Sequence, residues 1–544
     1  MKKFTALLLV FVLALGMLAG CTSSGDGGAD ADAPKVVRFG HSYDASSLDP
    51  LDIYDDGSYI VVMNIGEGLT RGYGNELYPG IAESWDVSED GLTYTFHLRE
   101  STWSDGTPLT AHDFVYTAQR ALDPDSAYEN AYGYYDFVNG EAAHMGEVPF
   151  EEVGVKALDD YTVQYTLNYP DSTFLYSVAG YSFYPLNQAK CEAEGAAYGT
   201  EADKVLTNGP FTCTEWIHES EIVITKNENY WNADSVKIDE VHFMVGAADT
   251  VARDLLLAGE LDGACMTTND DIAALESMLN SHVYDSGYYF CHLNCKGHDE
   301  EAGRFMSNAN FRKALSYAID RENILKIAKV TGQAADRISA PTLTTVSGRT
   351  WDEDYPVEGW PTTQQAGQAK AFLAAALEEL GATIDDVPEL RMLCFDSQSK
   401  MDKYQAMQDM YKQVLGIKTV IDPQPIQQLL TMADNGEFDF WLGGKTMEIP
   451  DWASEVGSEY DYTNASAVTG YENQTLTDYL NLCTRSQDMK DRENYLYEVE
   501  KIIIDDMTTL HLYWMQENLM TVPSLKGVEL ANGFGPYFGT AYFE

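Results

Sequence analysis

Alternating apolar and polar positions mark two short strands early in the chain. Tyr94, Phe96 and Leu98 share one face of a strand, with polar residues at the alternate positions. A preceding alternating run around Trp85 is separated from it by Ser-Glu-Asp-Gly at 88–91, where glycine allows the positive φ of a tight turn. The pattern therefore predicts a β-hairpin.

A helix is expected directly after the hairpin, beyond a turn at Asp105-Gly106-Thr107-Pro108. Thr110 and Asp113 have the spacing of the N-cap and N3 residues of a capping box. The apolar stripe that follows at helical spacing consists of Phe114, Val115, Ala118 and Leu122. A hairpin followed by a capped helix occurs in many folds, so this unit alone does not define the fold.

A second helical stripe lies in the middle of the chain. It consists of Phe311, Leu315, Ala318 and Ile319. Asp320 follows it and is expected to cap the next helix. Further upstream, Gly259 is expected to end a helix as its C-cap.

The N-terminus has the pattern of an export signal. Lys2 and Lys3 precede an apolar stretch from Phe4 to Leu18, which is too short to span a bilayer. Leu18-Ala19-Gly20-Cys21 resembles the bacterial lipobox, so residues 1–20 are expected to be a signal peptide and Cys21 a lipidated residue. An ordinary signal peptide with a coincidental cysteine is the alternative. Residues 21–34 contain little apolar surface and are predicted to form a flexible tether.

Composition and charge narrow the function classes. A chain of 544 residues with 45% hydrophobic residues should divide into two or three lobes. The formal net charge of −52 opposes binding to nucleic-acid phosphates and to anionic lipids. We therefore expect no nucleic-acid partner, and attachment to the membrane only through the lipid on Cys21.

Seven cysteines remain if Cys21 is lipidated, and an odd number cannot all pair. A domain of this size does not need disulfides for stability, so several are expected to be buried apolar residues. They are Cys191, Cys213, Cys265, Cys291, Cys295, Cys394 and Cys483.

Several short motifs occur in an order that is typical of one family. They are Leu48-Asp49-Pro50, Gly66-Glu67-Gly68-Leu69, Asn208-Gly209-Pro210-Phe211, Asn227-Glu228-Asn229-Tyr230-Trp231, Ala258-Gly259-Glu260-Leu261-Asp262 and the run from Phe311 to Arg321. Together with residues 79–120, the strongest block, they resemble the extracellular solute-binding proteins of family 5. These are the peptide- and nickel-binding components of ABC importers.

The resemblance implies an α/β, three-lobed, periplasmic-binding-protein-like fold of the large peptide-binding type, with a ligand cleft between two hinged lobes. Lobe I would combine residues 35–66, 196–294 and 511–544, lobe II would be residues 67–195, and lobe III residues 295–510. The chain would cross between lobes near Asn294 and near His511. Ligand binding would close the lobes, because one molecule contacts both.

The resemblance also implies which segments line the cleft. They are residues 54–58, the loop around Tyr132-Gly133-Tyr134-Tyr135, and the strand end from Trp441 to Met447. The candidate ligand-binding residues are Tyr54, Asp56, Tyr132, Tyr134, Asn208, Gly444, Lys445, Thr446, Met447 and Asp451. Generic packing is the alternative for the tyrosines, of which the chain has 35, and an ordinary surface turn is the alternative for residues 55–57.

The third segment departs from the family pattern. Oligopeptide binders of the family carry an aspartate here that holds the amino end of the peptide, and Thr446 occupies that position. Glu448 or Asp451 could substitute for it. Otherwise the ligand lacks a free amine, or is anchored through a carboxylate on Lys445. Our hypothesis is that Lys445 or Asp451 faces the ligand.

Other site patterns are weaker. Residues 443–446 end like a P-loop, but Asp439 stands at the position of its first glycine. Cys291, His292, Cys295 and His298 could suggest a metal, yet alternation along a strand scatters them over two faces. No Gly-x-Ser-x-Gly or His-Glu-x-x-His motif is present.

These observations favour a receptor, and we expect no enzyme activity, catalytic residue, metal or cofactor. The predicted protein is exported and lipid-anchored to the outer face of the cytoplasmic membrane, at the cell surface or in the periplasm. As a monomer it would capture a short peptide and deliver it to ABC permease and ATPase subunits. The alternatives are a receptor for another solute, such as a metal chelate or haem, and an exported hydrolase.

Overall fold

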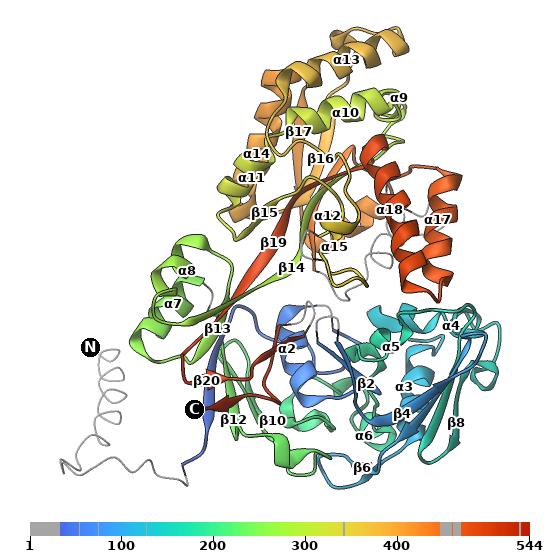
Figure 1. The fold of residues 1–544 in the computed structure, drawn as a ribbon, viewed down its shortest axis with the longest axis vertical. Coiled ribbons are helices and arrows are strands. Elements are labelled where there is room, and N and C mark those ends of the chain that lie inside the picture. The colour runs from blue at the N-terminus through green and yellow to red at the C-terminus, as the bar shows by residue number, and fades with distance from the viewer. Residues whose placement is uncertain are drawn as a thin grey trace, which may run out of the picture. The chain divides into compact units, whose positions relative to one another are not determined.

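A mixed β-sheet of 11 strands organises the protein, whose structure is a computed structural model (Figure 1). The structure describes residues 33–53, 55–73, 76–126, 128–247, 249–340, 343–446, 460, 469–531 and 535–544. Along the sheet the strands are β10 (Phe211–Ile217), β11 (Glu221–Lys226), β12 (Glu240–Val245), β1 (Val36–His41), β13 (Gly263–Met266), β19 (Thr509–Thr521), β14 (Asn280–Leu293), β18 (Phe440–Thr446), β16 (Leu390–Phe395) and β17 (Thr419–Gln424). The remaining strand, β15 (Gly332–Ala334), pairs with β19.

Three neighbouring strands of this sheet are parallel, and they bring their carboxyl ends to one edge. β1 pairs with β12 from Val36 opposite Glu240 onward, and with β13 at Phe39 opposite Gly263. In sheets of this kind, ligands bind outside the carboxyl ends of the strands. The α2 helix (Asp56–Ile65) begins at this edge soon after β1.

β14 and β19 join two otherwise separate hydrophobic cores. They pair antiparallel along most of their length (Figure 1). Tyr284 on β14 and Leu519 on β19 pack in the core that contains lobes I and II, whereas Tyr288 and Trp514 belong to the core of lobe III. The change of core thus falls inside both strands. Chain crossings near Asn294 and near His511 stay a prediction. The three sets of lobe boundaries remain predictions.

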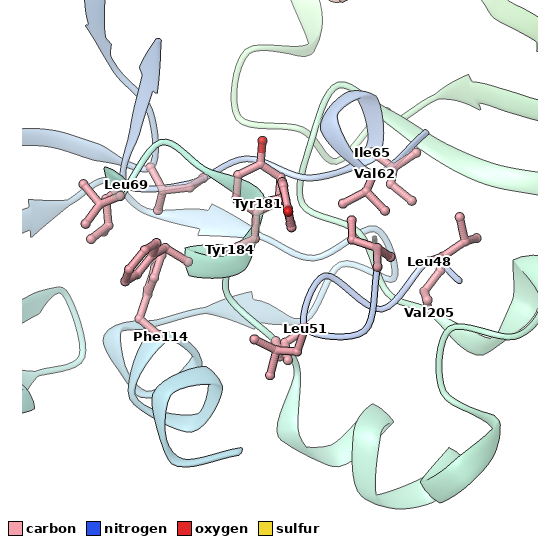
Figure 2. Packing of buried hydrophobic residues seen from close by; sticks show 14 of the residues in the cluster. Leu48, Leu51, Val62, Ile65, Leu69, Phe114, Tyr181, Tyr184 and Val205 are labelled. Carbon is pink, nitrogen blue, oxygen red and sulfur yellow. The ribbon is translucent and has the colours of Figure 1, made fainter. Parts of the chain in front are cut away.

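The hairpin and helix predicted from the sequence are confirmed in lobe II. A four-stranded sheet contains β4 (Ala82–Val87), β5 (Thr93–Leu98), β9 (Thr162–Thr166) and β8 (Val155–Asp159). Gly91 has φ +70° in the hairpin turn, and α3 (Ala111–Ala121) begins with the predicted capping box of Thr110 and Asp113. Figure 2 shows that Phe114 of α3 belongs to the same core as Leu51 and Ile65 of the predicted lobe I.

Helices provide most of the packing around lobe III. Here α10 buries the predicted stripe, and Asp320 caps α11 by accepting a hydrogen bond from Asn323 N (2.8 Å). The helices of this region are α9 (Glu300–Met306), α10 (Ala309–Ala318), α11 (Arg321–Ala328), α12 (Trp351–Asp354), α13 (Ala366–Leu380), α14 (Gln398–Met410), α15 (Ile426–Asp434), α17 (Gln474–Arg485) and α18 (Met489–Asp506).

Shorter elements complete the fold. The helices are α4 (Gly140–His144), α5 (Phe174–Ser177), α6 (Gln188–Glu194), α7 (Asp249–Ala258) and α8 (Asn269–Leu275), and Gly259 follows α7 with the φ of +72° expected of a C-cap glycine. The strand pairs are β2 (Thr70–Tyr73) with β3 (Glu76–Pro79), β6 (Ser101–Thr102) with β7 (Pro108–Leu109), β20 (Leu525–Lys526) with β23 (Tyr542–Phe543), and β21 (Glu529–Ala531) with β22 (Gly535–Tyr537).

The cysteine prediction is confirmed for the described part of the chain. None of the seven described cysteines forms a disulfide; six are buried and Cys265 is half-buried. Burial raises the pKa of the Cys191 thiol to about 11. Among the described helices, none has the length and apolar character needed to cross a membrane.

Candidate functional site

An acidic corner lies at the carboxyl ends of the parallel strands. Asp55 caps α2 by accepting a hydrogen bond from Ser58 N (2.8 Å), and Asp56 follows in the first helical turn. Asp56 keeps exposed surface, yet the surrounding protein removes enough water to raise its pKa, and the charge of Asp55 raises it further. Asp56 therefore places a carboxylate beside the carboxyl ends of the parallel strands, where a ligand is expected.

Glu517 of β19 is the second carboxylate of this corner. Its Oε2 accepts a hydrogen bond from the Tyr284 hydroxyl of β14 (2.8 Å). Burial raises the pKa of Glu517 to about 6, and the charges of Asp56 and Asp249 act in the same direction, against the opposing hydrogen bond from Tyr284. Within the described residues, no cation forms an ion pair with Asp56 or Glu517. Two acids that repel each other in a desolvated position favour binding of a positively charged group.

His41 lies at the foot of the same corner, at the end of β1. Its Nε2 atom is buried and accepts or donates no hydrogen bond within the described structure. Burial lowers the pKa of His41 to about 4, against the opposing charge of Asp55. The imidazole is therefore neutral at pH 7 and does not neutralise the acids beside it.

A face of aromatic rings and imidazoles lies on β14, β18 and β19 in lobe III. The rings of Tyr288 and His511 stack with centroids 4.4 Å apart, and Trp514 meets His511 edge-on at 5.4 Å. Lys445 pairs with Tyr288 across β14 and β18 and is half-buried. Burial lowers the pKa of His511 well below its usual range, and the positive charge of Lys445 contributes to this shift.

A buried arginine adds positive charge behind this face. Arg321 donates from Nε to the carbonyl of His511 (2.9 Å) and from Nη2 to the Ser316 hydroxyl (2.9 Å). Burial lowers the pKa of its guanidinium to about 10, so it remains charged at pH 7. The face that carries Lys445 is thus locally positive in a protein whose net charge is strongly negative.

Two sequence-predicted site residues lie in the interior. Tyr134 has no exposed surface, packs on Phe183 with centroids 4.7 Å apart, and donates to Ser182 O (2.8 Å). Asn208 is buried and donates to Glu67 O (2.8 Å). Tyr134 thus contributes to packing and Asn208 holds the backbone of residue 67, and the ligand-binding role predicted for each stays a prediction.

The other predicted residues differ in how far the structure describes them. Tyr132 is 61% exposed, in contrast to Tyr134. Gly444 is exposed and pairs with Tyr289. Thr446 is described as the last residue of β18 by its backbone alone. Tyr54, Met447, Glu448 and Asp451 lie outside the described residues, so their predicted roles stay predictions.

The family-like motifs of lobes I and II converge on one buried acid. Glu67, only 2% exposed, accepts hydrogen bonds from the Tyr230 hydroxyl (2.8 Å) and from Trp231 Nε1, and Arg71 Nε lies 3.3 Å from its Oε1. Arg99 covers the Trp231 ring at 3.7 Å. Glu67 is therefore a structural centre, because its oxygens are fully occupied by protein groups.

Sequence reasoning missed Glu517 and Tyr284. One signal could have indicated Glu517: it is the single acid in the mostly apolar run of residues 509–521. An acid in such a strand needs a specific reason.

The metal-like residues are not brought together. Cys291 is buried in the lobe III core, while His298 bonds Asp439 through Nδ1 (2.8 Å). Among the described residues, no group of three or more His, Cys, Asp or Glu side chains could hold a metal ion.

The chain is similar to known proteins in its family pattern, its sequence and its structure. The model of the bacterial extracellular solute-binding proteins, family 5 (middle region), matches residues 76–465. The oligopeptide-binding protein OppA of Bacillus subtilis is 29% identical over the full length of both chains. The substrate-binding domain of an oligopeptide ABC transporter from Bacillus anthracis superposes with a TM-score of 0.77 at 27% identity, over 94% of this chain and 99% of that one. Listeria monocytogenes OppA bound to peptide gives a TM-score of 0.76 at 25% identity, with the same coverage.

Proposed function

The chain belongs to the bacterial extracellular solute-binding proteins of family 5, and from this membership we propose that it captures short peptides for an ABC importer. The observation that carries the proposal is the likeness to a peptide-bound structure along 94% of the chain. The family consists of binding proteins, which supports a receptor rather than a hydrolase. Permease and ATPase subunits would receive the peptide and supply the energy.

The two charged regions of the site suit the two ends of a peptide. Asp56 and Glu517 would receive the amino end, because an ammonium group relieves the repulsion between two desolvated carboxylates. Lys445, whose charge is felt at His511, would face a carboxylate of the ligand. This arrangement accounts for Thr446 at the position where oligopeptide binders of the family carry an aspartate. Asp451 remains the alternative to Lys445 as the residue facing the ligand.

Calorimetry with blocked peptides tests both anchors. Trialanine, N-acetyl-trialanine and trialanine amide would be titrated into the wild type and into Glu517→Gln, Asp56→Asn and Lys445→Ala. We expect N-acetylation to weaken binding to the wild type about tenfold or more, because the ammonium group that relieves the repulsion between Asp56 and Glu517 is lost. Glu517→Gln should bind the free and acetylated peptides with similar affinity, and Lys445→Ala should do the same for the free and amidated ones.

The control is Glu276→Gln, which removes an exposed acid of the predicted lobe I outside the acidic corner. It should discriminate between the peptides as the wild type does. Equal affinity of the wild type for the free and acetylated peptides would exclude the amino-end anchor. Native mass spectrometry of protein purified with its bound ligand would decide between a peptide and another solute.

Membrane attachment is proposed through a lipid on Cys21. The lipobox-like sequence before it supports this, together with the acidic charge that disfavours direct binding to anionic membranes. Expressed in a bacterial host, the wild type should sediment with membranes, and Cys21→Ser should be released into the soluble fraction. We also propose that the protein acts as a monomer, which light scattering of the soluble form would test.

A further inference from the structure

Lobe II and lobe III touch at a point remote in sequence from β14 and β19. Gln487, between α17 and α18, donates from Nε2 to the carbonyl of Asp90 in the β4–β5 turn (2.9 Å). The Arg485 guanidinium lies 6.0 Å from the centre of the Tyr169 ring. These contacts join the two hydrophobic cores that otherwise share the strands β14 and β19.

Local hydrogen bonds order the backbone of the two segments that form this contact. In the turn, Gly91 N donates to Ser88 O (2.9 Å) and Thr93 N to the Ser88 hydroxyl (2.9 Å). On the other side, the Ser486 hydroxyl donates to Asp488 O (3.0 Å), and Asp488 caps α18. The backbone on both sides is therefore ordered, and forming the Gln487–Asp90 bond has to fix only the Gln487 side chain.

Gly91 lies directly against Gln487. A Cβ atom at this residue would lie 1.8 Å from Gln487 Nε2 and 2.8 Å from its Cδ. Gly91 is buried, although residues 88–90 of the same turn are exposed. Any side chain at position 91 would therefore have to push the two lobes apart or displace Gln487.

We propose that the Gly91–Gln487 contact is a latch that sets ligand affinity by stabilising the closed lobes, without either residue touching the ligand. The inference rests on the proposed receptor function, because affinity includes the free energy of lobe closure. A latch residue differs from a ligand contact in one respect: it changes affinity for every ligand by the same factor.

The test compares Gly91→Ala with Gly106→Ala. Gly106 also has a positive φ (+84°) in a turn of lobe II, and no atom lies within 4 Å of its would-be Cβ. Both variants carry the same backbone strain, but only Gly91→Ala meets lobe III. Small-angle scattering would measure the radius of gyration without ligand and with trialanine, and calorimetry would measure trialanine and tetra-alanine affinity.

Gly91→Ala should weaken both peptides by the same factor, about fivefold or more, because the new methyl group displaces the Gln487 side chain or separates the lobes, and separation would increase the radius of gyration. Gly106→Ala should match the wild type. Gln487→Ala loses one hydrogen bond of about 1 kcal/mol and should weaken both about fivefold. The double variant Gly91→Ala/Gln487→Ala should be no weaker than Gln487→Ala, because the new methyl group then has room.

Equal scattering and equal affinities for Gly91→Ala and Gly106→Ala would overturn the latch. So would a loss confined to one of the two peptides. If the wild type bound no peptide, the proposed function would fail by itself, and scattering of the unliganded variants would still decide whether the contact holds the lobes together.

Discussion

Glu67 and Glu517 are both acids that the fold removes from water, yet their surroundings are opposite. Glu67 receives a tyrosine hydroxyl, an indole N–H and an arginine. Glu517 receives one tyrosine hydroxyl and is surrounded by the negative charges of Asp56 and Asp249. The comparison shows that burial alone does not mark a functional acid. Burial raises the pKa of both acids, but Arg71 and the donors Trp231 and Tyr230 oppose this shift at Glu67, whereas Asp56 and Asp249 add to it at Glu517.

The largest expected effect comes from breaking the neutralised site. Glu67→Ala should lower the free energy of unfolding by about 3 kcal/mol, because Arg71 loses this ion pair and the Tyr230 hydroxyl and Trp231 Nε1 lose their acceptor. Urea denaturation would measure the loss. Glu83→Ala, at an exposed acid of the same lobe, should change stability by less than about 0.5 kcal/mol. A similar small change at Glu67 would contradict its role as a structural centre.

The second effect concerns ligand affinity at Glu517. This carboxylate is ionised above a pH of about 6 and protonated below it. Affinity for trialanine should therefore fall as the pH is lowered from 7.5 to 5, by about tenfold for the one proton taken up. In Glu517→Gln this pH dependence should disappear, and calorimetry at the two pH values would show it.

Stability should respond to Glu517 in the opposite sense. The folded-state pKa is raised above the ordinary value of 4.5, so the stability linked to this group is present below pH 4.5 and is lost as the pH rises through 6. Without ligand, Glu517→Gln should thus unfold at higher urea concentration than the wild type at pH 7.5, and at a similar one at pH 4. A destabilised variant at pH 7.5 would mean that Glu517 is structural, like Glu67.

The smallest expected effect on stability comes from a third arrangement, in which two glutamates flank one histidine near the surface. His242 lies between Glu221 and Glu240, with each ring nitrogen 3.0 Å from a carboxylate oxygen. Burial opposes its charge, but the two glutamates raise its pKa overall. The resulting stability is present below pH 6.5 and is lost as the pH rises through the folded-state pKa.

His242→Gln should consequently lower stability by less than about 1 kcal/mol at pH 5.5 and leave it unchanged at pH 9. Thermal unfolding at both pH values and at two salt concentrations would check this. An equal loss at both pH values would indicate packing rather than charge.

Local features of the fold could be predicted from the sequence, whereas the contacts across it could not. The turn at Gly91, the capping box of α3 and the stripe of α10 depend on residues within a few positions of one another, so their spacing predicts them. Glu67 stood in a recognised motif, but its meeting with Tyr230 and Trp231 depends on folding over 160 residues of chain.

The candidate site shows the same limit. Asp56 was predicted from its place after the opening motif, and the structure adds Glu517 from the other end of the chain. Tyr132 and Tyr134 were indistinguishable in sequence, because alternation in a loop does not reveal which ring faces the core. The Tyr134 ring is buried because it packs on Phe137 and Phe183. Phe183 is remote from Tyr134 in the sequence, so spacing alone could not predict this contact.

The pairing of β14 with β19 also has an architectural consequence. Leu293 N donates to Thr508 O (3.1 Å), and His292 faces Thr509, so the two strands stay paired up to the point where the chain leaves β14 and later enters β19. Residues 294–508 are therefore inserted between the paired ends of β14 and β19. Because this insertion enters and leaves the sheet at one pair of adjacent strand ends, its loops can vary in length without changing how β14 pairs with β19.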